Sequence, residues 1–569
     1  MAGGCAIYIG DNPMRQQTNP FGKDIANRGL FRAFAEHGPW DDQLFLVHNK
    51  IDDVKLASNL FDGGPAPKPI LSTSILNHRA ISARGTLFRG QAKIGDLAWQ
   101  RRQTNERAYS LVGLVHSLAP QAMRAYTAEA VTSPVEPWDA LICTSPAVER
   151  HLRTLLEETS DYMTARFAGP GAQRQLPLPH LPVIPLGIDA AAFAARGEAS
   201  RRREAREYFG VAEDAFALLW VGRLSFFEKA YPQAMFAAAE ETARRTGRAV
   251  EFLMAGWFPD GGQGRGHWEA AAALYAPSVK VRFLDGNDSG VLERIWAASD
   301  VFVSLVDNIQ ETFGITPIEA MAAGLPVVVS DWDGYRATVR HGVTGFRIPT
   351  MMAPGGTGRQ MAQRHALGMD NYQIYVAQVA AHVAVNVRAA ADALTALATD
   401  TALAARMGAA AAVHARQTFD WPVVIAQYAA LFEELRAIRQ SASAYEADGA
   451  PRANPVRNDP FGAFASFAST RLDGDILFRP APPAAVTESL AHHNTALNNL
   501  TGIWRLPPEA TDRIRTLVTE RGEISLMELV AAVGQVPHEF LARHLVWMCK
   551  VGLLDWATTE PVEIDVPDR

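Results

Sequence analysis

The chain has 569 residues, more than one hydrophobic core usually holds, so two or three domains are expected. Its 54 basic and 61 acidic residues give a formal net charge of -7, which excludes a general electrostatic attraction to nucleic acid or to an anionic membrane. The 3 cysteines are far apart and lack CxxC spacing, which argues against a disulfide framework or a zinc knuckle. Because no apolar run reaches the ~20 residues that span a bilayer, we expect a cytoplasmic protein.

The first 440 or so residues alternate short apolar runs with helical patterns, which is typical of parallel sheets covered by helices on both faces. In the first half a helix is expected from about Asp24, and a proline-rich stretch at 176–187 ends the half. The expected strands of this half lie at 6–9, 44–47, 109–116 and 140–144.

A second half of the same kind follows. Its apolar runs are of the fully buried type, at 217–222, 251–255, 279–284, 301–306 and 327–330. Residues 351–369 are rich in Met, Gly and Pro and have weak periodicity, so we expect an insertion or a loop there, with helical patterns resuming at about Tyr372.

After Arg439 the composition turns to Ser, Ala, Asn and Pro as far as Pro460, which indicates a linker. Three short helical patterns follow and resemble a winged-helix or helix-turn-helix core. They lie at 508–521, 525–534 and 538–552.

The most informative stretch is ETFGITPIEAMAAGLPVVVS, residues 311–330. Pro317 suits the first turn of a helix, Gly324 suits its end, and Pro326 cannot continue it, so a short helix between two strands is expected. At the carboxyl end of a parallel strand, such a helix N-terminus favours a phosphate. The amides of Phe313, Gly314 and Ile315 would face that phosphate.

Two glutamates flank this turn. Glu311 precedes it and could reach sugar hydroxyls, whereas Glu319, expected in the first helical turn, could accept both hydroxyls of a ribose. Taken singly, Glu319 could merely complement the helix dipole and Glu311 could be a solvated loop residue. Their shared position around a glycine-containing turn favours a sugar-nucleotide site.

A basic pair follows the first strand of the second half. Arg223 and Lys229 lie six residues apart in a chain where arginine far outnumbers lysine. They could hold both phosphates of a diphosphate leaving group without a metal. The alternative is an exposed basic pair on a loop.

These segments resemble the Glu-x7-Glu signature of retaining glycosyltransferases of the family-four, group 1 type. The flanking runs at 298–304 and 342–346 are similar to that family as well. The chain departs from it at Ala230, where glycine is usual after the lysine, and at Ala337, where glutamate is frequent. The resemblance covers about residues 6–439 and implies the two-domain GT-B fold, retention of anomeric configuration and no metal.

The resemblance adds two residues in the first half. Gly22 lies in the loop 19–24, where the family has a glycine-rich loop under the donor phosphates; an ordinary strand-to-helix turn capped by Asp24 is the alternative. His116 ends a strand and, with the resemblance, is expected to contact the donor sugar or the acceptor, although a lone histidine is more often structural. The resemblance thus gives Glu311, Arg223, Lys229 and His116 catalytic roles.

The predicted fold is therefore α/β, with two Rossmann-like domains facing a cleft and a small, mainly helical, winged-helix-like domain. The boundaries are 1–190 with a return helix at about 420–440, 191–419 with an insertion at about 351–371, a linker at 441–460, and an accessory domain at 461–569.

The predicted activity is transfer of a sugar from a nucleotide diphosphate-sugar to an unidentified acceptor, which could be a glycan, a lipid-linked sugar or a small molecule. No cofactor and no nucleic-acid partner are expected, while a peripheral membrane contact stays open. The accessory domain would serve oligomerisation or partner binding. The alternative is a sugar-nucleotide-responsive regulator that binds DNA through the helix at 538–550, although that helix is mostly apolar.

Overall fold

The computed structural model describes the chain in two compact units, Met1–Ala453 and Asn454–Arg569, which are treated separately below. Its description runs from residue 4 to residue 558. The residues outside the description within that span are 13, 15–21, 169–176, 260, 261, 263, 443–451, 473–475, 483–495, 497–501 and 535.

The first half of the large unit is a six-stranded parallel sheet with the strand order β3-β2-β1-β4-β5-β6. This is the order of a doubly wound Rossmann-type sheet, in which the chain starts in the middle and returns to it. Its elements are β1 (Cys5–Gly10), α1 (Gly22–His37), β2 (Gln43–Val47), α2 (Asp53–Leu60), β3 (Ile70–Ser74), α3 (His78–Arg84), β4 (Thr86–Arg89), α4 (Gly95–Arg102), β5 (Ser110–Val115), α5 (Gln121–Thr132), β6 (Ala140–Cys143) and α6 (Pro146–Ala168).

The second half repeats this plan with the strand order β12-β11-β10-β7-β8-β9. Strand β8 is buried at every position, as expected of a parallel strand with helices on both faces. The elements are α7 (Ala190–Arg196), α8 (Arg202–Phe209), β7 (Phe216–Val221), α9 (Gln233–Thr246), β8 (Val250–Gly256), α10 (Arg265–Tyr275), β9 (Lys280–Asp285), α11 (Ser289–Ala298), β10 (Val301–Ser304), α12 (Ile315–Ala322), β11 (Val327–Ser330), α13 (Tyr335–Thr338), β12 (Gly345–Ile348), α16 (Val387–Thr399) and α17 (Thr401–Phe419).

Between β12 and α16 the chain makes an insertion with its own secondary structure. It comprises β13 (Thr350–Met352), α14 (Arg359–Ala366), α15 (Tyr372–Ala380) and β14 (Val383–Val385), and β13 pairs antiparallel with β14. The helical pattern expected from Tyr372 is α15. The expectation of a loop over 351–369 was wrong in part, because α14 lies inside it; its many polar residues and its short length hid the periodicity.

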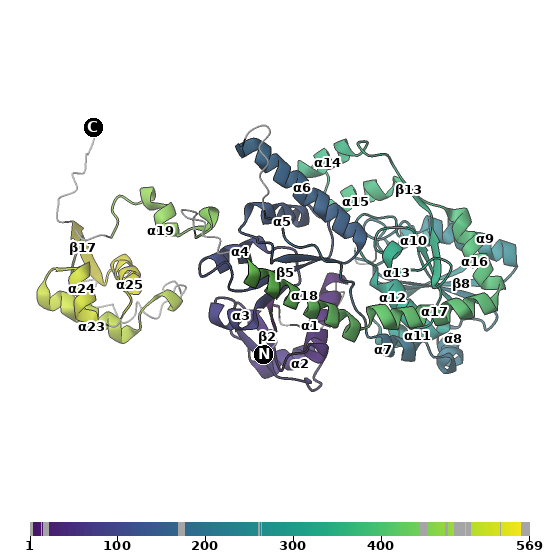
Figure 1. Ribbon diagram of the computed structural model, residues 1–569, viewed down its shortest axis with the longest axis horizontal. Coiled ribbons are helices and arrows are strands. Elements are labelled where there is room, and N and C mark those ends of the chain that lie inside the picture. Colours follow the sequence, from purple (N-terminus) through teal and green to yellow (C-terminus); the bar gives the residue numbers. More distant parts are fainter. Residues whose placement is uncertain are drawn as a thin grey trace. The chain divides into compact units, whose positions relative to one another are not determined.

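Helix α18 (Trp421–Ser441) returns from the second half to the first. In Figure 1 this green helix lies among the purple and blue elements of the first half. Its Tyr428 meets Phe34 edge-to-face at 5.1 Å between ring centroids, and Arg439 donates to the Gly85 carbonyl at 2.7 Å. One hydrophobic cluster therefore runs from the first sheet through α18 into the second half.

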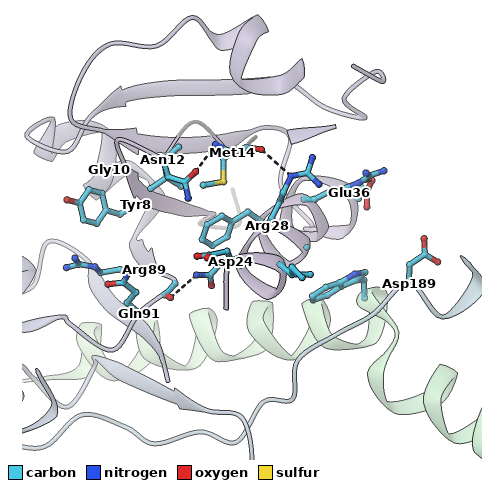
Figure 2. Close-up of a pocket in the computed structure, with 18 of the residues that line it drawn as sticks. Tyr8, Gly10, Asn12, Met14, Asp24, Arg28, Glu36, Arg89, Gln91 and Asp189 are labelled. Carbon is cyan, nitrogen blue, oxygen red and sulfur yellow. Dashed lines mark hydrogen bonds and ion pairs between the residues drawn. The ribbon is translucent and has the colours of Figure 1, made fainter. Parts of the chain in front are cut away.

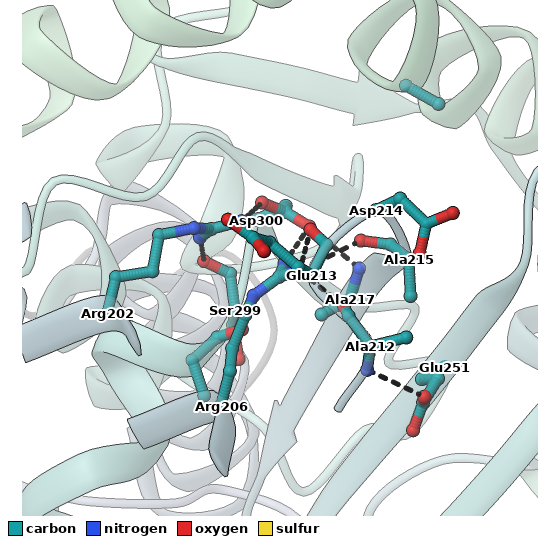
Figure 3. Close-up of polar contacts among 12 residues, drawn as sticks. Arg202, Arg206, Ala212, Glu213, Asp214, Ala215, Ala217, Glu251, Ser299 and Asp300 are labelled. Atoms are coloured by element: carbon teal, nitrogen blue, oxygen red, sulfur yellow. Dashed lines mark hydrogen bonds and ion pairs between the residues drawn. The ribbon is translucent and has the colours of Figure 1, made fainter. Parts of the chain in front are cut away.

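Buried arginines close the amino-terminal edges of both sheets. In the second half, Arg206 donates to Asp300, at 2.8 Å, and to the carbonyls of Ala298, Ala212, Glu213 and Ala215 (Figure 3). Asp300 directly precedes β10 and also binds Arg202 at 2.6 Å.

The first half has a counterpart in the pair Arg101–Asp139, whose side chains are both fully buried. Asp139 also accepts from the amides of Leu111 and Glu136, whereas Nε of Arg101 has no hydrogen-bond partner among the described residues.

The small unit combines a three-stranded antiparallel sheet with short helices around a separate hydrophobic cluster. The helices α23, α24 and α25 agree closely with the three predicted helical patterns. The described elements are α19 (Pro460–Ala463), β15 (Ile476–Pro480), α23 (Pro508–Arg521), β16 (Ile524–Ser525), α24 (Leu526–Val533), α25 (His538–Lys550) and β17 (Leu554–Thr558). Part of the predicted linker, 443–451, lies outside the described residues.

The predicted fold class, two Rossmann-like domains of the GT-B type with a helical domain after them, is thus confirmed.

Candidate functional site

Loops at the carboxyl edges of the two sheets meet inside the large unit. The Thr312 hydroxyl donates to the carbonyl of His116 at 2.6 Å. The Thr144 hydroxyl donates to the Thr312 carbonyl, and the Ser117 hydroxyl to the Gln310 carbonyl, both at 3.4 Å. The predicted catalytic residues His116 and Glu311 therefore lie on loops in direct contact.

The turn before α12 has the geometry expected of a ligand-binding helix N-terminus. Gly314 is the N-cap residue with a left-handed φ of 82°, and a Cβ on it would lie 1.8 Å from the Tyr335 ring, so only glycine fits. The amides of Phe313, Gly314 and Ile315 belong to the cap and the start of the helix, as predicted. Pro317 lies in the first turn of α12, as predicted, but Glu319 is the fifth residue of this helix and lies in its second turn, not in the first.

Glu311 is held as a carboxylate at this turn. Its Oε2 accepts from the Lys229 ammonium at 3.0 Å, and its Oε1 accepts from the amides of Thr312 and Phe313. Burial alone would raise the pKa of Glu311, but the Lys229 charge and these hydrogen bonds keep that pKa below its usual value. The structure thus joins two residues that the sequence placed in separate motifs.

The pKa of Glu319 is shifted in the opposite direction from that of Glu311. Burial raises its pKa to about 7, and the positive charge of Arg196 lowers it only in part. A carboxyl group in this state gains from hydroxyl partners, which could satisfy its oxygens in place of water.

Arg223 lies on the same loop as Lys229, after β7. It donates to Glu228 at 2.5 Å, and the two side chains of that pair are only 10% and 11% exposed. The loop therefore carries two cations, each held by a carboxylate, at the carboxyl edge of the second sheet.

His116 is neutral. Burial, together with the charge of Lys23, lowers its pKa to about 4. Its Nε2 lies 2.8 Å from Oδ1 of Asn27, whose amide nitrogen donates to the Gly90 carbonyl at 3.0 Å. Because the Asn27 oxygen can only accept, Nε2 carries the proton and Nδ1 is the unprotonated nitrogen.

A cavity of about 1040 Å³ has Asn27, the partner of His116, in its lining, whereas His116, Arg223, Lys229, Glu311 and Glu319 do not line it (Figure 2). In the first half it is lined by the end of β1, by α1 and by the end of β4; Gly286, Asn287 and Leu292 of the second half also contribute. Met14 is fixed there by an amide contact to Asn12 and a carbonyl contact to Arg28. The polar lining and this volume suit a ligand the size of a nucleotide-sugar.

Gly22 begins α1, is exposed and does not line this cavity. Residues 19–21 of the loop in which it was predicted to act, 19–24, lie outside the described residues.

Sequence reasoning missed Glu228 and Asn27. Glu228 could have been suspected, because it directly precedes Lys229 in a loop already assigned to charge. Asn27 could not, because it approaches His116 across 89 residues of sequence.

Comparisons with known proteins find similarity to glycosyltransferases over part of the chain. Residues 201–353 match the family model described as "Glycosyl transferases group 1". A D-inositol 3-phosphate glycosyltransferase of Actinosynnema mirum is 32% identical over 170 residues, which are 29% of this chain and 39% of the relative. A protein of the same description from Kribbella flavida is 29% identical over 278 residues, 48% of this chain and 54% of the relative. The chain thus spans about half, or less, of the length of these curated relatives.

Among solved structures, an Anabaena protein crystallised with UDP-glucose aligns with a TM-score of 0.46 and 16% identity, over 76% of this chain and 99% of the other. Within the described part of the chain, no helix has the length and apolar character needed to cross a membrane.

Proposed function

Residues 201–353 match the model of the group 1 glycosyltransferases, and from that premise we propose that the protein is a retaining glycosyltransferase. It transfers a sugar from a nucleotide diphosphate-sugar to a hydroxylated acceptor, without a metal ion. The observation that supports the proposal is the contact between Lys229 and Glu311, 3.0 Å apart, on loops after β7 and β10. In this proposal Lys229 binds a phosphate of the donor and Glu311 binds its sugar.

The diphosphate is the leaving group in this proposal. As its bond to the anomeric carbon breaks, negative charge develops on the phosphate oxygens and positive charge on the sugar ring. Arg223, Lys229 and the amides of Phe313 to Ile315 stabilise the developing negative charge. All of these groups surround the carboxyl edge of β7 and β10, where a parallel sheet receives its ligands.

The acceptor hydroxyl attacks from the face that the diphosphate leaves. Its oxygen forms the new bond to the anomeric carbon, and its proton passes to a departing phosphate oxygen. Glu311 and neutral His116 orient the sugar, while Glu319 accepts the ribose hydroxyls. Neutrality of His116 suits this role, because an imidazolium beside the oxocarbenium-like centre would oppose the positive charge that forms there.

The regulator hypothesis gains no support from α25. Arg543, one of its cations, lies over the rings of Trp504 and Phe540 at 5.2 and 4.8 Å from their centroids. It therefore packs within the small unit instead of extending toward a phosphate backbone.

A calorimetric screen of UDP-, GDP- and ADP-sugars against the full chain tests the proposal. We expect one nucleotide class to bind and its sugar to be released slowly to water in the absence of acceptor. Absence of both binding and turnover with all of these donors would refute the assignment.

Metal independence has its own test. Turnover should survive EDTA, because Arg223 and Lys229 supply the charge that a divalent ion supplies elsewhere. Loss of turnover in EDTA with recovery in magnesium or manganese would overturn this part of the mechanism.

A further inference from the structure

A second cavity, of about 420 Å³, lies between the two halves of the large unit. The first half contributes the residues after β5 and the start of α6, and the second half contributes the loops after β10 and β11. The insertion supplies Thr350 and Tyr375 to its wall. The family match ends at residue 353, so α14, α15 and β14 of the insertion lie beyond it.

This cavity adjoins the proposed reaction centre. Thr312 lines it and directly follows Glu311 in the chain. The hydroxyl of Thr312 also donates to the carbonyl of His116. A molecule in the cavity would therefore reach the sugar-binding residues from the side of Thr312.

The insertion is firmly attached at this position. The Tyr372 hydroxyl donates to Oε1 of Gln310 at 2.7 Å, next to Glu311. One turn further along α15, Tyr375 stacks on His365 of α14, with 4.6 Å between centroids and 5° between ring planes. Tyr372 thus contacts the loop that carries Glu311, while Tyr375 forms part of the cavity wall.

The lining combines aromatic rings with acidic side chains and with the basic side chains of Arg124, His151 and Arg336. The Trp332 ring is fixed by its Nε1, which donates to the Asn308 carbonyl at 3.0 Å. The next residue, Asp333, has a left-handed φ of 38°, accepts from the Ser145 hydroxyl at 3.2 Å and lines the same cavity. A non-glycine residue in that conformation is strained and is often found at functional sites.

Aromatic rings beside charged hydrogen-bonding groups suit a polyhydroxylated ring. Sugar and cyclitol rings present apolar C–H faces that pack on aromatic side chains and hydroxyls that donate to carboxylates. The volume is within the range of about 300 to 1,000 Å³ that small-molecule sites occupy.

We propose that this second cavity is the acceptor subsite, that it takes a hydroxylated six-membered ring, and that the insertion helix α15 sets acceptor choice through Tyr375. The inference rests on the proposed glycosyltransferase function. It goes beyond that function by naming the acceptor class and the residues that select it.

The test uses the full chain with the donor identified by calorimetry. Release of the nucleoside diphosphate is measured with methyl α-glucopyranoside, myo-inositol or glycerol added, and the products are identified by mass spectrometry. We expect at least one ring compound to accelerate release and to become glycosylated, and glycerol to do neither. In Tyr375→Ala the KM for that ring should rise about tenfold or more, and a larger share of the donor should go to water.

Three variants make the result specific. Tyr375→Phe keeps the ring and should keep the KM near the original value, and Gln373→Ala, at an exposed position on α15, should change neither KM nor product. Ala147→Phe fills the cavity from the opposite wall and should raise the same KM even if Tyr375→Ala is unstable.

The outcomes separate the two proposals. An unchanged KM in folded Tyr375→Ala and Ala147→Phe overturns the subsite, and a donor that is hydrolysed but never transferred to a ring overturns the acceptor class. A chain that neither binds nor turns over any nucleotide-sugar overturns the glycosyltransferase assignment and the subsite with it.

Discussion

The two ends of strand β10 carry ion pairs of opposite character. Before the strand, Asp300 binds Arg206, whose side chain is 4% exposed and also donates to four backbone carbonyls. After the strand, Glu311 binds Lys229, whose side chain is 28% exposed. The first pair has its hydrogen-bonding capacity used inside the protein, whereas the Lys229 ammonium can still donate to a ligand.

The contrast between the two ends of β10 suggests a way to distinguish structural ion pairs from functional ones in this fold. The first half repeats it, with the buried pair Arg101–Asp139 at the amino-terminal edge of its sheet and His116 at the carboxyl edge. The buried pairs at the amino-terminal edges join helices to the residues that precede strands, while the residues at the carboxyl edges lie on loops where the two halves meet. Each prediction below alters one side of this contrast.

The largest effect on the stability of the fold is expected from a substitution at the amino-terminal edge of the second sheet. Arg206→Leu should lower the free energy of unfolding by about 3 kcal/mol, because Asp300 loses a partner and backbone carbonyls lose their donor. Urea denaturation measures it. Arg244→Leu, at a side chain that is 70% exposed, is the control and should stay within about 0.5 kcal/mol of the unaltered protein. Equal stability of the two variants would contradict the structural role of Arg206.

Substitutions at the carboxyl edge of the second sheet should lower the turnover rate. Lys229→Ala and Arg223→Ala should each lower kcat about 10² to 10³-fold, because both cations act on charge that develops in the transition state. Each substitution leaves a carboxylate, Glu311 or Glu228, without its cation, so turnover is compared only in variants whose folding has been confirmed. Lys280→Ala, at a 59% exposed lysine near the other edge of the sheet, is the control and should keep full turnover. Normal rates in folded Lys229→Ala and Arg223→Ala would remove the diphosphate assignment.

A smaller effect concerns Glu319 and pH. With a pKa of about 7 in the free protein, Glu319 is mainly neutral below that pH and ionised above it. Since the ionised carboxylate accepts ribose hydroxyls more strongly, nucleotide-sugar binding should tighten severalfold as the pH rises through about 7 and then level off. Calorimetry with the intact donor measures this. Glu319→Gln should bind with little pH dependence in that range, and a dependence retained in this variant would assign it to another group.

Most of the fold could be predicted from the sequence, because buried parallel strands are continuous apolar runs. Strands β7, β8 and β11 are of this type. The pattern failed at α14, a short and mainly polar helix with no buried residue, where the apolar residues are too few to mark a helix face.

The site was predictable only where its chemistry is local. The turn from Glu311 to Gly314 combines a carboxylate, a glycine and a helix start within a few residues. The Lys229–Glu311 pair and the Thr312–His116 contact depend on how loops from different strands meet, over 82 and 196 residues of sequence. Patterns along the chain carry no signal for such contacts.

The smallest expected effect comes from the small unit. Its core, which includes Phe478, Ile514 and Leu545, forms a cluster separate from those of the large unit. Every residue assigned here to the donor lies before Ala323, and α18, which completes the first half, ends at Ser441. Removal of 454–569 should therefore leave the Kd for the nucleotide-sugar within about threefold, since no donor contact is lost. Acceptor choice, assembly state or solubility could change without affecting this result. A folded truncation whose calorimetric Kd rises by far more would place part of the donor site in the small unit, and the edge of β10 would no longer account for donor binding alone.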